Sequence, residues 1–181
     1  MSEPLTLAET ADLLGRCRYV ELAFFTRLGA RAPACGEAAL VVYLAGASRA
    51  HGFRAGLVES ALPVAASWPD ATGFTRSPGS RLDEALDVLV GPAGDEELVD
   101  ALVGVVYPAM VSAYASHLEL AAGPADAATR RTLRRLLADL ADVAAEGREL
   151  APGRADSWRA RRVRELLEQV PGPFGPLRRP S

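Results

Sequence analysis

The sequence predicts an all-α fold in which four long helices form two pairs. Apolar residues recur at alternating steps of three and four along four long stretches of the chain, which is the spacing of one face of a helix. Short links join the first stretch to the second and the third to the fourth, whereas the long segment 63–94 separates the two pairs. Short links make neighbouring helices antiparallel, and the long one can cross the whole bundle.

The composition fits one folded domain, residues 1–150, followed by a short appendage, residues 151–181. The chain has 181 residues, of which 49% are apolar, enough for a sizeable core. Its net charge of −3 gives no general attraction to nucleic acids or acidic membranes. The N-terminus lacks the basic and apolar segments of a signal peptide, and no apolar run reaches the ~18 residues of a membrane span. We therefore expect a cytoplasmic protein that binds neither nucleic acid nor membranes.

The first two helices have clear start and stop signals. Thr6 and Glu9 have the spacing of a capping box, in which each side chain binds a free backbone N–H of the first turn. Gly29 is a typical residue at which to end this helix. The second helix is expected to begin near Pro33, since proline suits a first helical turn, and to end before Pro63.

The crossover, residues 63–94, is rich in proline and glycine and breaks the helical pattern. We expect one short helix inside it, capped at Ser80. The third long helix begins at Asp95, where further acidic residues in the first turn favour the helix dipole. Pro108 lies inside this helix and should kink it, and Gly123 ends it.

The fourth long helix spans about residues 126–150 and is followed by a short amphipathic helix over residues 154–170. We expect Trp158 and Leu166 to dock this last helix on the bundle or on a second subunit. Its Arg-rich face, residues 159–164, should be solvated. The final eleven residues, PGPFGPLRRPS, are a loose Pro/Gly-rich tail.

Several polar side chains fall on the inward faces of these helices and are candidate functional residues. The chain has only two histidines, His51 in the second helix and His117 in the third. Ser48 precedes His51 by three residues, which places both on one face of the helix. Glu21 lies inward on the first helix and Tyr114 inward on the third.

Two hairpins joined by one long crossover resemble the ferritin-like four-helix bundles. The resemblance covers residues 5–150. The segments Arg18-Tyr19-Val20-Glu21-Leu22 and Ser48-Arg49-Ala50-His51-Gly52-Phe53-Arg54 also resemble uncharacterised actinobacterial ferritin-like proteins. For that group the resemblance implies no established activity.

The resemblance implies where a metal site would lie. Ferritin-like carboxylate proteins take one Glu from the first and third helices and a Glu-x-x-His pair from the second and fourth. Glu21 and His51 match this pattern, but Ser48 replaces the carboxylate of the second helix. The third helix offers only Tyr114 and His117, and the fourth has no histidine. A full two-metal site is therefore not expected.

A reduced site of His51, Glu21 and Asp139 would be the remaining way to bind iron or manganese, since non-haem iron uses histidines with a carboxylate. Counting from a tight first hairpin puts Glu21 level with Val41, about ten residues, or ~15 Å, from His51. The same count separates His51 from His117 by ~9 Å. These separations are too large for ligands of one ion, so we predict no cofactor.

A structural role for the same residues is the preferred alternative. A buried imidazole needs a partner, so His51 is expected to be a core histidine that is hydrogen-bonded to a carboxylate or hydroxyl. Its candidate partners by the same count are Asp12, Tyr114 and Asp139. Glu21, as a buried carboxylate, needs an arginine such as Arg18 or Arg148.

Three functional hypotheses follow. The leading one is a non-catalytic ferritin-like protein with a structural or interaction role, forming a homodimer through exposed apolar residues such as Trp68 and Phe74 and through the tail. The second is an iron- or manganese-dependent oxidoreductase with a degenerate site at His51 and Glu21. The third is a binder of a small apolar ligand in the bundle core.

Overall fold

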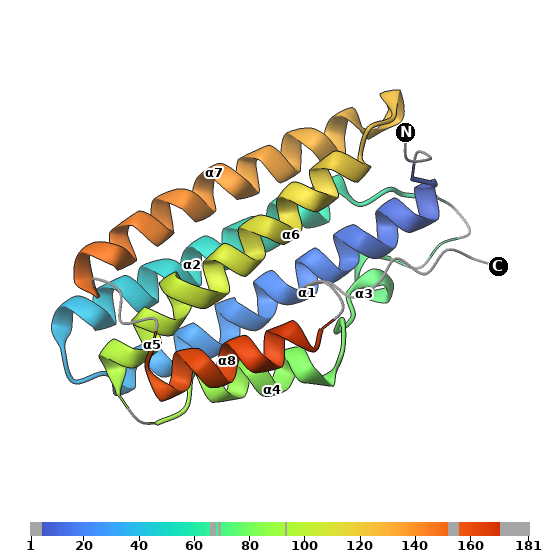
Figure 1. Cartoon of the computed structure of the whole chain (residues 1–181). Helices are drawn as coiled ribbons and strands as arrows, with labels where there is room; N and C mark the ends of the chain where they lie inside the picture. The colour runs from blue at the N-terminus through green and yellow to red at the C-terminus, as the bar shows by residue number, and fades with distance from the viewer. Residues whose placement is uncertain (1–4, 66–67, 69, 93, 152–155, 171–181) are drawn as a thin grey trace.

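The computed structural model describes residues 5–65, 68, 70–92, 94–151 and 156–170, and this part of the chain is helical without strands. The predicted all-α class is confirmed. Four long helical stretches lie side by side (Figure 1), and the third of them is built from three consecutive segments. They are α1 (Leu7–Arg31), α2 (Ala38–Ala61), α5 (Asp95–Ala101) continued by a π-helical segment (Leu102–Val106) and α6 (Tyr107–Leu120), and α7 (Ala127–Leu150).

The helix directions follow from the lengths of the links. In Figure 1, α1 runs antiparallel to α2, and α6 runs antiparallel to α7. The crossover carries α3 (Ala71–Phe74) and α4 (Ser80–Leu89) and returns the chain to the end at which α2 began, so α2 and α6 run parallel (Figure 1). The last helix, α8 (Trp158–Glu168), packs beside α4 on the outside of the bundle.

The start of α1 is as predicted, but its end is not. The Thr6 hydroxyl accepts a hydrogen bond from the Glu9 N–H at 3.2 Å, and the Glu9 carboxylate accepts one from the Thr6 N–H at 2.8 Å. The helix continues past Gly29 to Arg31 and into a 3-10 turn, Ala32–Ala34. As a result α2 begins only at Ala38, which changes the pairing of the two helices.

Pro108 distorts the third helix through a π-helical segment. The Tyr107 N–H bonds to the carbonyl of Leu102, five residues back. Proline has no N–H for the carbonyl four residues before it, and its ring clashes with that carbonyl in an α-helix. Widening the preceding turn removes the conflict. Pro108 thus sits in the first turn of α6.

The stretch Asp95–Leu120 is long and apolar enough, by length and composition, to cross a membrane, with a mean hydropathy of 1.6 over 18 residues. The same test is passed by the core helix of a soluble protein. Within this bundle 67% of that window is buried, and the helix packs against α7.

The docking of α8 differs from the prediction. Trp158 is 64% exposed, whereas Arg159 is buried and donates hydrogen bonds to the carbonyls of Gly94 and Gly91 at 2.8 and 3.0 Å. Leu166 is buried as expected. Trp158 lies at the first helical position, where its side chain points away from the face that carries Ala160 and Val163. Arginine, with its long stem and five donors, instead caps the carbonyls that precede α5.

Candidate functional site

The strongest concentration of buried polar groups surrounds Glu21, in the middle of α1. Its side chain is fully buried, and charged or polar side chains reach it from α2 and α6. We call this group the Glu21 cluster. Its members are Glu21, His51, Arg54, Tyr107 and Tyr114.

Both oxygens of the Glu21 carboxylate accept hydrogen bonds. Oε2 lies 2.6 Å from His51 Nδ1 and accepts from Arg54 Nε at 3.0 Å. Oε1 accepts from the hydroxyl of Tyr114. Because two acceptors do not approach to 2.6 Å without a hydrogen between them, His51 Nδ1 carries the hydrogen and donates it to Glu21. Arg54 Nη2 also lies 2.8 Å from Nδ1; because both nitrogens carry hydrogens, this is a close contact of two donors that share the Glu21 carboxylate.

Charge balance allows these groups to be buried together. Burial disfavours the charged form of Glu21, but the neighbouring His51 and Arg54 and the hydrogen bonds outweigh it, and the pKa of the carboxyl lies below its usual value. Burial lowers the pKa of His51 and, with the Arg54 charge, outweighs the opposing effect of the Glu21 carboxylate, so His51 is neutral at pH 7. The cluster thus consists of one carboxylate and one guanidinium, with neutral groups around them.

The other side of the His51 ring closes the cluster. Nε2 accepts a hydrogen bond from the Tyr107 hydroxyl at 3.4 Å, and the ring stacks on Phe24 with centroids 4.7 Å apart. Tyr43, also buried, donates to the carbonyl of Val143 at 3.1 Å. Aromatic rings and their hydroxyls therefore separate the charged pair from the rest of the core.

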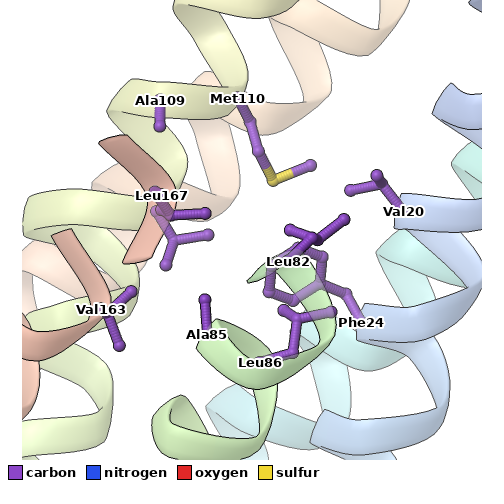
Figure 2. A pocket seen from close by; sticks show the side chains of 10 residues that line it. Val20, Phe24, Leu82, Ala85, Leu86, Ala109, Met110, Val163 and Leu167 are labelled. Atoms are coloured by element: carbon purple, nitrogen blue, oxygen red, sulfur yellow. The ribbon is translucent and has the colours of Figure 1, made fainter. Parts of the chain in front are cut away.

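Phe24 also borders an apolar cavity, which Figure 2 shows from close by. The cavity has a volume of about 20 Å³ and lies between α1, α4, the third helix and α8. Figure 2 shows Met110, Leu82 and Val163 at its edges, without a polar side chain among the residues drawn. Small-molecule sites have volumes of roughly 300 Å³ or more, so this space is a packing defect rather than a ligand pocket.

The predicted separation of Glu21 and His51 is wrong. The count along the first hairpin assumed that the helices turn at residues 28–34, whereas α1 extends to Arg31 and α2 starts at Ala38. The later start moves every residue of α2 closer to the turn than assumed. His51 is consequently level with Glu21 and in direct contact with it, not ~15 Å away.

The expected ion-pair partner of Glu21 is also corrected. An arginine does hold the carboxylate, but it is Arg54 rather than Arg18 or Arg148. Arg18 instead binds Thr75 and Glu59 on the outside. The sequence does contain a signal that favours Arg54 as the partner. Arg54 follows His51 by three residues and therefore lies on the same face of the helix.

The remaining candidate residues lie elsewhere. Asp139 lines an outer groove between α2 and α7 with Asp142 and Glu146; the structure does not bring it to Glu21. Asp12, also considered as a partner of His51, pairs with Arg16 and Arg76.

Ser48, three residues before His51 on α2, makes a backbone contact. Its hydroxyl donates to the carbonyl of Phe25 at 2.7 Å. A Cβ on Gly29 would lie 2.9 Å from the Ser48 oxygen. The two helices are therefore in close contact at this level.

A second, smaller polar site lies nearby. The Nδ1 atom of His117 lies 3.7 Å from the Cys17 sulfur, and both side chains are buried. Burial raises the pKa of the Cys17 thiol and lowers the pKa of His117 to about 4. Within the described residues, His117 Nε2 has no hydrogen-bond partner. We call these two residues the Cys17–His117 pair.

Among the described residues, no group of three or more His, Cys, Asp or Glu side chains is placed to hold a metal ion. No protein-family model matches the chain, and searches of curated proteins and of solved structures find no match. The site therefore has to be interpreted from its own geometry.

Proposed function

We propose that the protein is a non-catalytic, ferritin-like helical bundle with a structural or interaction role, acting as a homodimer. The observation that carries the proposal is the position of Arg54. Its guanidinium contacts the carboxylate of Glu21 and the imidazole of His51, which are the two groups that match a ferritin-type ligand set. A cation supplied by the protein thus stands where such a bundle would bind a metal.

The hydrogen bonds of the Glu21 cluster support this proposal. Hydrogen bonds from Arg54, His51 and Tyr114 occupy both oxygens of the Glu21 carboxylate and use three of its roughly four lone-pair sites. Metal entry would require these bonds to break and a second positive charge to be placed next to the guanidinium, which repels it. The residues present therefore do not fit a metal centre.

The contact at Ser48 argues in the same direction. The Glu-x-x-His pattern needs a carboxylate at this position, but the close approach of Gly29 to Ser48 leaves room for a small side chain. The serine is instead used to join α2 to the backbone of α1. This is a contact that stabilises the hairpin.

An interaction role is supported by large apolar side chains on the outside of α1 and α2. Phe25, Val42 and Phe53 are exposed, and such residues favour contact with another surface. The crossover residues Trp68 and Phe74 are less available for such a contact. Their rings pack edge to face on one another, with centroids 5.5 Å apart, and both side chains are partly buried.

The proposal is tested by loading the purified protein with Fe(II) or Mn(II), removing unbound metal and measuring the metal content and the melting temperature. We expect no stoichiometric metal and an unchanged melting temperature, because a bound ion would stabilise the folded state. His117→Ala is the matched control for His51→Ala, since each removes one buried histidine. About one metal per chain that His51→Ala removes and His117→Ala retains would overturn the proposal in favour of a metal site at the Glu21 cluster.

A further inference from the structure

The outer seam between α2 and α7 carries two neighbouring grooves of opposite charge. One, of about 590 Å³, is lined by Asp139, Asp142, Glu146 and Arg49. The other, of about 270 Å³, has Arg131 and Arg135 as its charged lining residues. Phe53 lies where they meet, because its ring lines the acidic groove while the Arg135 guanidinium lies 5.4 Å from its centroid. We call this surface the α2–α7 face; the two helices lie side by side in Figure 1.

Electrostatics within α7 do not account for this arrangement. The helix dipole favours acidic residues towards the N-terminus and basic residues towards the C-terminus. In α7 all the arginines except Arg148 lie in the first half, and the acidic residues lie in the second. Arg135 also precedes Asp139 by four residues, which is the less favourable order for an ion pair along a helix. The charges are therefore separated along α7 without a benefit to the helix itself.

Among the described residues, the charges of this face form no ion pairs, in contrast to those on the side of α4 and α8. On the side of α4 and α8, Arg27, Arg81 and Arg162 all form ion pairs with acidic residues. In the part of the chain that the structure describes, no ion pair involves the six charged residues that line the two grooves. Within the described part of the chain, these charges are therefore open to pairing with another molecule.

We propose that the α2–α7 face binds a second copy of this chain about a two-fold axis that passes close to Phe53. A two-fold interface places the same surface on both sides, with each contact made twice. Rotation about an axis between the two grooves lays the basic groove of one copy on the acidic groove of the other. The face is thus complementary to itself in charge, and the proposal rests on the interaction role proposed above.

The middle of the face has the side chains that a stable contact needs. Phe53 is 54% exposed and would meet the same residue of the partner near the axis. Aromatic residues and arginine are enriched at the centres of protein interfaces, and Arg135 already covers the Phe53 ring. The charged grooves on either side then fix the register and exclude a parallel arrangement.

The test is sedimentation equilibrium of the full-length chain and of two charge-reversed variants. Arg131→Glu/Arg135→Glu makes the whole face acidic, and Asp139→Arg/Asp142→Arg makes it basic. We expect the wild type to be dimeric and each variant to dissociate at least about tenfold more readily, because like charges then meet. An equimolar mixture of the two variants should form a heterodimer, since one face is then acidic and the other basic.

Arg148→Glu/Arg161→Glu is the matched control for Arg131→Glu/Arg135→Glu, because it makes the same change in net charge at exposed positions outside the grooves. The dimer of this control should be as stable as that of the wild type. Circular dichroism checks that each variant is folded. A monomeric wild type, or dimers that neither reversal weakens, would overturn the inference. Dimers that neither reversal weakens would leave the proposed homodimer standing and refute only this interface, whereas a monomeric wild type would contradict both. Neither result affects the metal measurement, which tests the rest of the proposed function separately.

Discussion

The two histidines are both buried in the same bundle, yet they lie in opposite surroundings. His51 sits in the Glu21 cluster, where a carboxylate, a guanidinium and a hydroxyl surround it. His117 has only the Cys17 sulfur at 3.7 Å, and its other nitrogen has no partner among the described residues. One site is a charge-balanced network, and the other is an isolated polar pair in an apolar core.

The difference shows two ways in which a core can hold a titratable group. In the Glu21 cluster, charged groups stay charged because each compensates another. In the Cys17–His117 pair, burial alone lowers the pKa of His117 to about 4, and burial together with the Glu21 charge raises the pKa of the Cys17 thiol, so both groups stay neutral. The first site should therefore respond mainly to removal of a partner, and the second mainly to pH.

The largest expected effect is that of Arg54→Met, which leaves the Glu21 carboxylate buried without its cation. Breaking a buried ion pair from one side typically destabilises by about 3–5 kcal/mol. Urea unfolding measures this, and Arg148→Met is the control, since Arg148 is exposed and its removal should change stability by less than about 0.5 kcal/mol. If Arg54→Met changes the stability as little as Arg148→Met does, the Glu21 cluster does not depend on its charge balance, and its contrast with the Cys17–His117 pair is lost.

A smaller effect is expected on the pH dependence of stability when His117 is replaced by Leu. The folded-state pKa of His117 is depressed to about 4, while the unfolded chain titrates near 6.5. The unfolded state therefore binds the proton first as pH falls, and His117 lowers the stability of the wild type progressively between about pH 6.5 and 4. Integrated over this window, the loss is about 3 kcal/mol.

The measurement for this prediction is the difference in unfolding free energy between wild type and His117→Leu at a series of pH values. Relative to the wild type, the variant should gain stability as pH falls through the window and then reach a plateau. A difference that is the same at pH 7 and at pH 4 would show that His117 is accessible to protons in the folded state. It would thereby contradict the description of the Cys17–His117 pair as an isolated buried site.

Much of the fold could be predicted from the sequence because its signals are local. The capping box at Thr6 and Glu9, the end of α2 before Pro63 and the distortion near Pro108 each depend on residues within one or two turns. The ends of helices are less well specified, and at Gly29 the helix simply continues. That small error at one end became a large error in the pairing of α1 with α2.

The candidate site could be predicted in type but not in geometry. Glu21 and His51 fall on inward faces, and a buried carboxylate needs an arginine, so a network of this kind is foreseeable. Which arginine approaches depends on the register of two helices, and the register depends on where α1 stops. The sequence also predicts Asp139 within about a turn of His51, and Asp139 does share a groove with Ala50 and Phe53, but it faces the outside of the bundle rather than the core.

The central claim is that the Arg54 guanidinium balances the Glu21 carboxylate in the core, and a double-mutant cycle of Glu21→Gln and Arg54→Met tests it most directly. Each single change leaves one buried charge, while the double variant leaves none and retains an acceptor oxygen for either Tyr114 or His51. We predict that the double variant is more stable than the sum of the single effects implies, by at least about 2 kcal/mol. Single effects that add to within about 0.5 kcal/mol would contradict the account.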